Sequence, residues 1–234
     1  MEKRYIIGID QSTQGTKALL FDGVGHLLRR TDLPHRQIVN EKGWVSHDLN
    51  EIYRNTVQTV KTLVAESGVA PETIAGIGIS NQRETTAIWD KATGEPLEEA
   101  IVWQCGRASG IAQEIAEQGH AEEIREATGL QLSAYFPAAK MAWLLRNGGE
   151  ERQKRAADGK LCLGTIDSWL VYKLTGDHAF KTDFSNASRT QLFNLKTLAW
   201  DEKICEIFGI PACALARVCL LYTSPSPRDS TSSR

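Results

Sequence analysis

The stretch YIIGIDQSTQGTKALLFDGVGHLLRR, residues 5–30, decides the fold. It holds three strand-like runs, at 5–10, 17–22 and 27–30, and segments rich in Gly, Ser, Thr and Gln separate them. Short apolar runs divided by turn-forming residues are typical of strands that follow one another in an antiparallel sheet. The stretch therefore predicts a three-stranded antiparallel meander near the start of the chain.

A helix is predicted to follow the meander. Asp48 is a favourable cap, and Glu51 stands three residues later, which is the pattern of a capping box. Apolar side chains then recur at helical spacing along one face. They are Leu49, Ile52, Tyr53, Val57, Val60, Leu63 and Val64. The sequence therefore predicts an amphipathic helix that begins at about residue 49.

Strands and helices are expected to alternate through the rest of the chain. Apolar segments at 74–80, 85–90 and 100–104 predict strands, and residues 109–175 predict a mainly helical region that Gly and Pro interrupt. Because strands and helices interleave, the expected class is α/β, with a mixed sheet and flanking helices.

Composition excludes several classes of function. The chain has 234 residues, 41% of them apolar and 24% charged, with a formal net charge of −2. A nucleic-acid-binding domain would need a basic face, and no dense run of Lys or Arg occurs. No apolar stretch is long enough to span a bilayer, and the polar start does not resemble a secretory signal. The expected location is therefore the cytoplasm.

The five cysteines are predicted to be reduced thiols. They are Cys105, Cys162, Cys205, Cys213 and Cys219, and no two of them form a CxxC pair. An odd count and the lack of histidines at metal-ligand spacing argue against both a disulfide framework and a zinc site.

The first turn of the meander is a candidate phosphate site. Small residues in a tight turn present backbone N–H groups and hydroxyls, and a lysine adds positive charge. The residues expected to contact phosphate are Ser12, Thr13, Gln14, Gly15 and Lys17. Asp10 is expected to act on phosphate through Mg²⁺ and water, because both groups are anionic. A strand follows the turn, so it is no P-loop, and an ordinary hairpin turn is the alternative.

Further segments along the chain strengthen the phosphate interpretation. They are GWVSHD (43–48), ISNQRETT (79–86), WD (89–90), AIVWQC (100–105), TGL (128–130), YF (135–136), GTIDSWL (164–170) and TDFSNASRT (182–190). In this order and spacing they resemble the FGGY family of carbohydrate kinases, part of the superfamily of actin, hexokinase and Hsp70 ATPases. The resemblance extends over about residues 4–218 and is strongest to the members that act on glycerol.

The resemblance implies a ribonuclease-H-like, actin/hexokinase-type N-terminal domain at 1–218. It also implies an activity: ATP, with Mg²⁺, phosphorylates glycerol to glycerol 3-phosphate. By motif match, Arg83, Glu84 and Tyr135 would bind glycerol hydroxyls, and Trp103 would wall its carbon chain. Their chemistry agrees, because Glu84 accepts hydrogen bonds and Arg83 donates them. Arg83 and Glu84 are also expected to restrain each other through their opposite charges.

Alternatives remain for these residues and for the activity. Taken alone, Arg83 and Glu84 would be a solvated surface pair, while Trp103 and Tyr135 would be core residues. Another short polyol or sugar is the second substrate class, and a non-catalytic binding lobe is the alternative from a different functional class. The expected partners are glycerol and ATP, and the resemblance implies a homo-oligomer for the full-length protein.

No catalytic base is assigned. In the family this base is an Asp in a Gly-Asp-Gln segment, and the sequence contains no such segment. Residues 219–234 read CLLYTSPSPRDSTSSR, and the second half of this segment consists of Ser, Thr, Pro and charged residues without apolar periodicity. They are predicted to be a disordered, non-native tail on an N-terminal fragment, with a natural disordered tail as the alternative.

Overall fold

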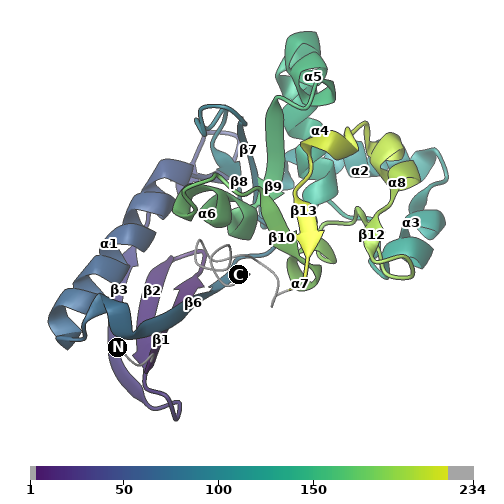
Figure 1. Ribbon diagram of the computed structural model, residues 1–234. Coiled ribbons are helices and arrows are strands. Elements are labelled where there is room, and N and C mark those ends of the chain that lie inside the picture. The colour runs from purple at the N-terminus through teal and green to yellow at the C-terminus, as the bar shows by residue number, and fades with distance from the viewer. Residues whose placement is uncertain (1–3, 221–234) are drawn as a thin grey trace. The chain divides into compact units, whose positions relative to one another are not determined.

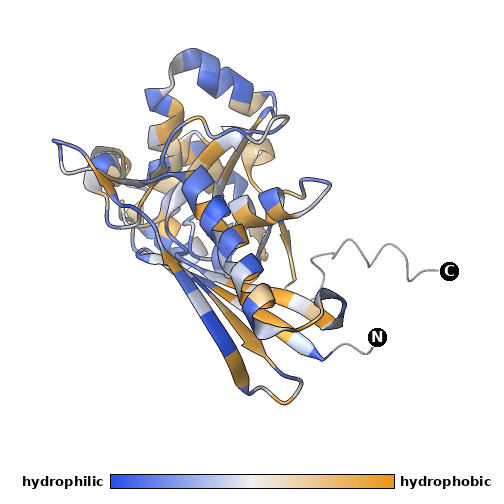
Figure 2. Cartoon of the chain, turned by 90° about the vertical axis from the view of Figure 1, so that its left-hand side faces the viewer, coloured by the Kyte–Doolittle hydropathy of each residue, from blue (hydrophilic) through white to orange (hydrophobic). Residues whose placement is uncertain are grey.

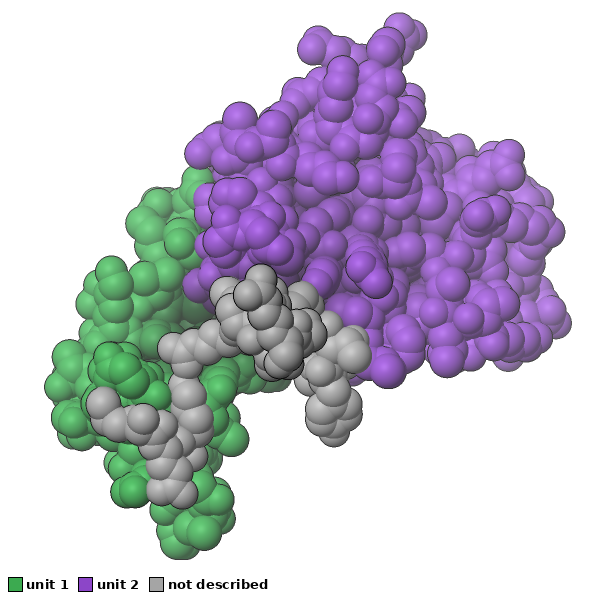
Figure 3. Space-filling view, in the orientation of Figure 1, with its two compact units in different colours: residues 1–38, 47–82 green, residues 39–46, 83–234 purple. Residues whose placement is uncertain are grey.

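The chain forms two compact units in the computed structural model, which describes residues 4–220. The first unit comprises Met1–Ile38 and His47–Gln82, and the second comprises Val39–Ser46 and the chain from Arg83 onward. Figure 3 distinguishes the two units by colour. Each unit has its own hydrophobic cluster.

The first unit is a four-stranded mixed sheet with one long helix. Its elements are β1 (Tyr5–Gln11), β2 (Gly15–Phe21), β3 (Leu27–Pro34), α1 (Leu49–Ser67), the 3₁₀ turn η1 (Pro71–Thr73) and β6 (Ile74–Asn81). The strand order is β3-β2-β1-β6. The β1–β2 and β2–β3 pairs are antiparallel, which confirms the predicted meander, and β6 adds a parallel strand beside β1.

Helix α1 packs on the sheet of the first unit (Figure 1). Its buried residues recur every three or four positions, and they are Leu49, Ile52, Thr56, Thr59 and Leu63. Two threonines thus occupy the predicted apolar face, and each satisfies its hydroxyl by donating to a carbonyl one turn back. Hydrophilic and hydrophobic segments alternate along this helix in Figure 2, as expected for a helix with one buried face.

The predicted cap of α1 is correct in part. The Asp48 carboxylate accepts the N–H of Asn50 at 2.8 Å, so Asp48 is the cap. The capping box is wrong, because the Glu51 carboxylate accepts the backbone N–H of Arg36 at 3.3 Å instead. A contact with a residue distant in sequence therefore replaces the local one.

The second unit mixes short strands with several helices. Its strands are β5 (Val45–His47, which ends at the unit boundary), β7 (Thr86–Asp90), β8 (Ala100–Ile101), β9 (Leu161–Thr165), β10 (Lys181–Asp183), β11 (Phe193–Asn194), β12 (Ala199–Trp200) and β13 (Arg217–Cys219). Its helices are η2 (Gly106–Ala108), α2 (Ser109–Glu117), α3 (Ala121–Thr128), α4 (Pro137–Asn147), α5 (Gly149–Ala157), α6 (Ile166–Leu174), α7 (Phe184–Ala187), α8 (Glu202–Phe208) and η3 (Ala212–Ala214).

The main sheet of the second unit has the order β4-β5-β8-β7-β9, where β4 is Ile38–Val39. Strand β9 is fully buried and pairs antiparallel with β7. The mainly helical prediction for 109–175 is wrong at β9, because five consecutive buried residues carry no periodicity that separates strand from helix. The predicted strand at 100–104 is confirmed only at β8.

Helix α4 lies in the core of the second unit, and its first nine positions are almost all buried. It contacts α2, α5, α8, β7 and β9. Pro137 opens the helix, where its missing N–H costs nothing. This burial fixes the start of α4, and with it the segment 133–136 that precedes the helix.

The remaining predictions concern the cysteines, membrane-spanning helices and the C-terminal residues. All five cysteines are free, as expected. Among residues 4–220, no helix combines the length and the apolar character needed to cross a membrane. Cys219, the first residue of the predicted tail, lies in strand β13 opposite Asp183 of β10. Residues 221–234 of the predicted tail lie outside the described residues. The domain boundary at residue 218 stays a prediction.

Candidate functional site

The predicted phosphate turn connects β1 to β2 in the first unit. The backbone N–H and the hydroxyl of Ser12 both donate to the carbonyl of Gly15, at 2.9 and 3.0 Å. Across the two strands, Lys17 Nζ lies 3.1 Å from Asp10 Oδ2. The turn is therefore closed by its own backbone, and an ion pair stands at its base.

Gly15 lies very close to the backbone of the neighbouring strand β3. A Cβ atom at this position would lie 2.6 Å from the carbonyl oxygen of Leu33 and 3.0 Å from Pro34 Cα. The glycine is thus required by the neighbouring backbone of β3. Any larger residue would have to push the β2–β3 pairing apart at the turn.

A cavity of about 290 Å³ lies beside this turn. Its lining residues are Ser12, Gln14, Gly15, Thr16, Lys17, Asp32, Leu33 and Pro34, and the predicted Thr13 is not among them. The hydroxyl of Thr16 is buried and has no hydrogen-bond partner within the described chain.

The charges at this cavity argue against binding of a bare anion. Lys17 is paired with Asp10 and stands opposite Asp32 in the β2–β3 register. Asp32 is itself paired with Arg30 at 3.3 Å, so two carboxylates offset two cationic groups and leave no net positive charge for an anion. An anionic phosphate would need a cation to enter this environment, and the half-exposed Asp10 carboxylate, with one oxygen on Lys17, fits a hydrated Mg²⁺.

Two histidines of the first unit form a buried pair near the turn. The rings of His35 and His47 meet edge to face with centroids 4.7 Å apart. The backbone N–H of His35 donates to the carbonyl of Gln14 at 3.2 Å. Burial lowers the pKa of His35 to about 4, and the nearby His47 acts in the same direction. Burial also lowers the pKa of His47.

This pair should make folding stability pH-dependent. The unfolded His35 binds a proton near pH 6.5 and the folded one only near 4, so stability present above pH 6.5 is lost as the pH falls toward 4. The share of His35 should be about 2 kcal/mol between pH 7 and pH 5. Urea unfolding at both pH values checks it.

The matched variants for that measurement are His35→Gln and His26→Gln. His26 is an exposed histidine of the same unit, with a side chain 77% exposed. His35→Gln should shrink the loss of unfolding free energy between pH 7 and pH 5, and His26→Gln should not. An unchanged loss in His35→Gln would contradict the assignment.

In the second unit, Glu84 is buried and paired. Its side chain is 9% exposed, and its Oε1 accepts the Nε–H of Arg189 at 2.8 Å. The expectation that Arg83 restrains Glu84 is wrong, because the partner of Glu84 is 105 residues further along the chain. Arg83 itself is exposed.

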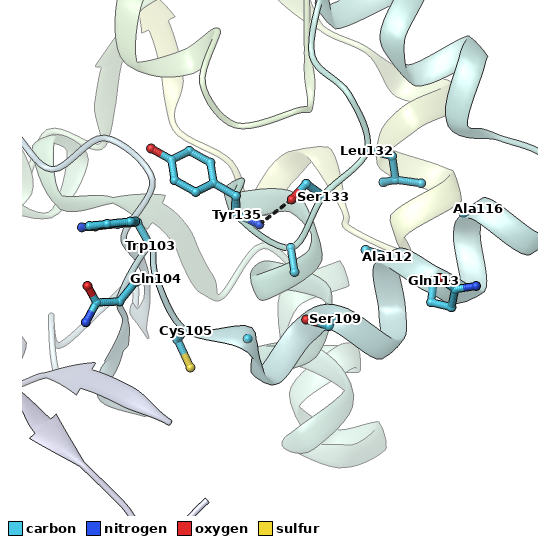
Figure 4. A pocket seen from close by; sticks show the side chains of 12 residues that line it. Trp103, Gln104, Cys105, Ser109, Ala112, Gln113, Ala116, Leu132, Ser133 and Tyr135 are labelled. Atoms are coloured by element: carbon cyan, nitrogen blue, oxygen red, sulfur yellow. Dashed lines mark hydrogen bonds between the residues drawn. The ribbon is translucent and has the colours of Figure 1, made fainter. Parts of the chain in front are cut away.

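The structure brings Trp103 and Tyr135 together. Their ring centroids are 5.8 Å apart, and both line a cavity of about 500 Å³. Figure 4 shows them at one end of this cavity, with Tyr135 held by a hydrogen bond from its N–H to the Ser133 hydroxyl at 3.1 Å. Gln104, Ser109 and other residues line the rest of the cavity, but Arg83 and Glu84 do not.

The sequence does not single out Lys140, although it is fully buried at the start of α4. Its ammonium donates to the carbonyls of Tyr135 and Phe136. Burial lowers the pKa of Lys140 to about 7, while the charges of Cys105 and Glu84 act to raise it. A lysine in the first turn of a helix is normally exposed, so nothing in the local sequence indicates that Lys140 is buried.

Residues 5–222 match the N-terminal domain of the FGGY family of carbohydrate kinases. The chain belongs to this family. It is 48% identical over 217 residues to a glycerol kinase of Symbiobacterium thermophilum, covering 93% of this chain and 43% of that protein. It is 45% identical to glycerol kinase 2 of Thermotoga maritima over 92% of this chain and 43% of the relative. The chain thus spans less than half the length of these relatives.

Solved structures agree with the family assignment. The glycerol kinase of Plasmodium falciparum with ADP superposes with a TM-score of 0.82 at 36% identity, over 93% of this chain and 43% of that one. A ligand-bound xylulose kinase from Lactobacillus acidophilus gives 0.81 at 27% identity, over 92% and 42%. The expected ribonuclease-H-like ATPase fold is confirmed.

Proposed function

We propose that the full-length protein transfers the γ-phosphoryl group of ATP to glycerol, giving glycerol 3-phosphate and ADP. The observation that carries this proposal is the identity of 45–48% to proteins named glycerol kinase across nearly the whole chain. The paired aromatic rings of Trp103 and Tyr135 at one cavity are the geometry that supports it.

The polyol would be bound by the second unit. Glu84 would accept a hydrogen bond from one hydroxyl, Arg83 would donate to another, and the Tyr135 hydroxyl would contact a third. The faces of Trp103 would cover the CH₂ edge of the polyol. Arg83 is exposed and therefore free of the packing that holds Glu84, so it would close on the substrate as it binds.

The phosphates would be bound by the turn of the first unit. Its backbone N–H groups, Gln14 and the Lys17 ammonium would donate to phosphate oxygens, and Asp10 would hold hydrated Mg²⁺. When bound, Mg²⁺ neutralises charge that the carboxylates beside Lys17 would otherwise repel. Within the described chain, no three His, Cys, Asp or Glu side chains gather at a metal site, which agrees with a cation held mainly through water and phosphate.

A larger polyol or a sugar is the second candidate substrate. The cavity that Trp103 and Tyr135 border has a volume of about 500 Å³, and it continues past the rings to Ser109 and Gln113. A three-carbon polyol would fill only part of such a space. Cytoplasmic location and assembly into a homo-oligomer stay predictions for the full-length protein.

A substrate panel tests the proposal. The full-length protein should release ADP from Mg-ATP in the presence of glycerol, with a higher kcat/KM than with erythritol, ribitol, xylulose or gluconate. A higher kcat/KM for one of the longer compounds would transfer the proposal to that substrate. No turnover with any of them would refute a polyol or sugar kinase function.

A further inference from the structure

Arg189 connects two parts of the second unit that carry candidate polyol-binding residues. Its Nε–H donates to Glu84 Oε1 at 2.8 Å. The carbon of its guanidinium group lies 5.1 Å from the centroid of the Phe136 ring, and Phe136 is the neighbour of Tyr135, with ring centroids 5.0 Å apart. One side chain therefore contacts both the carboxylate and the aromatic segment.

We propose that Arg189 is a positioning residue, which holds the Glu84 carboxylate in place relative to Tyr135 so that one carboxylate oxygen faces the polyol. The role rests on the proposed function, because it assumes that Glu84 and Tyr135 share a substrate. Arg189 itself need not touch the polyol.

The hydrogen-bonding capacity of Glu84 fits this role. A carboxylate has two oxygens and can accept about four hydrogen bonds. Arg189 occupies Oε1, so Oε2 remains for a substrate hydroxyl. A largely buried ion pair keeps its geometry only if both side chains are fixed by their neighbours, because rotation of either side chain would break the hydrogen bond between them.

The other end of Arg189 is also held. Its guanidinium lies over the Phe136 ring, and the carbonyl of Phe136 accepts from Lys140 at 3.4 Å. The N–H of Ala138 donates to the carbonyl of Thr190 at 2.9 Å, which ties the residue after Arg189 to the start of α4. Arg189 thus has fixed neighbours on the backbone side and on the ring side.

A lysine buried at the same place supports the interpretation. Lys140 lies in the first turn of α4, where the helix dipole and burial both disfavour a cation. Its compensation is to donate to the carbonyls of Tyr135 and Phe136. Lys140 therefore holds the backbone of the segment that carries Tyr135, and Arg189 contacts the Phe136 ring of the same segment.

Kinetics of the full-length protein test the positioning role. Arg189→Met keeps the length and the apolar contact with Phe136 but removes the donor, and Arg189→Lys keeps the charge. We expect Arg189→Met to raise the KM for glycerol about tenfold, as for a lost charge-assisted hydrogen bond. The KM for ATP should be unchanged, and Arg189→Lys should restore part of the loss.

Arg155→Met is the matched control. Arg155 pairs with Asp90 at 2.6 Å in the same unit and has similar exposure, with 34% against 28% for Arg189. It should leave the KM for glycerol unchanged. In a Glu84→Gln background, Arg189→Met should add much less than in the wild type, because it acts through Glu84. Additive effects, or an unchanged KM in Arg189→Met, would overturn the positioning role.

Unfolding of the 234-residue chain separates this proposal from the proposed function. The Arg189→Met and Glu84→Gln changes should be non-additive in urea unfolding, since the two side chains share one ion pair. Additivity there would overturn the contact itself, whatever the substrate. If the two changes couple in unfolding but the wild type turns over no polyol or sugar, the proposed function fails and the positioning role fails with it, while the contact stands.

Discussion

Replacement of Glu84 by glutamine should lower kcat/KM for glycerol in the full-length protein by about 10- to 100-fold. The change removes a charged acceptor, and hydrogen bonds to charged groups contribute about 1.5–3 kcal/mol. Glutamine keeps the shape of a side chain that is 9% exposed, so no cavity forms. The KM for ATP should stay within about twofold of its original value, because Glu84 is assigned to the proposed polyol site and not to the phosphate turn. Steady-state kinetics with each substrate varied in turn give both values.

Two companion variants show whether that loss belongs to substrate binding. Arg83→Ala should reduce glycerol use by a similar factor while leaving thermal stability almost unchanged, because Arg83 is exposed. Glu114→Gln is the control, since Glu114 forms an exposed ion pair with Arg146 at 2.6 Å in the same unit. Normal glycerol kinetics in both Glu84→Gln and Arg83→Ala would refute the polyol-site assignment.

Local sequence patterns predicted the strands and the helix that depend on neighbouring residues in the sequence. The meander of β1, β2 and β3 follows from short apolar runs and turn residues, and α1 follows from a cap and a helical repeat. Strand β9 could not be predicted, because a run buried on both faces has no period to reveal it. The Glu51 contact with the Arg36 backbone was equally hidden, since it depends on where the chain returns after β3.

The candidate site also combines features that the sequence predicted with features that depend on tertiary packing. Motif matching singled out Glu84, Trp103 and Tyr135, and the structure places the two aromatic rings at one cavity. Motif matching did not reveal that Glu84 forms its ion pair with Arg189, because 105 residues separate the two in the sequence. Nor did it reveal Lys140, whose burial is set by tertiary packing around α4. Residue type and spacing pointed to candidate substrate-binding side chains, whereas the partners that hold them depend on tertiary packing.

Gly15 is subject to a constraint that the sequence did not reveal. The sequence places Gly15 among the residues expected to contact phosphate, and the structure adds that a Cβ there would collide with the backbone of β3 at Leu33 and Pro34. The turn is therefore shaped by cross-strand packing in the first unit. Its use for phosphate, if the proposed function holds, depends on that packing and on the Lys17–Asp10 pair.

The 234-residue chain by itself should show no detectable glycerol-dependent release of ADP from Mg-ATP. It spans about 43% of the length of its relatives, and the Gly-Asp-Gln segment that carries the family's base does not occur in it. The two carboxylates assigned to the sites are each in an ion pair, Asp10 with Lys17 and Glu84 with Arg189. Both are assigned to binding, of Mg²⁺ and of the polyol, and no residue of the chain is assigned to take the proton of a substrate hydroxyl, as phosphoryl transfer requires. A coupled ADP assay checks this, with the full-length protein as the positive control and circular dichroism to verify that the shorter chain is folded. Turnover by the folded 234-residue chain at a rate close to that of the full-length protein would contradict the prediction and would require a base among the residues of this chain.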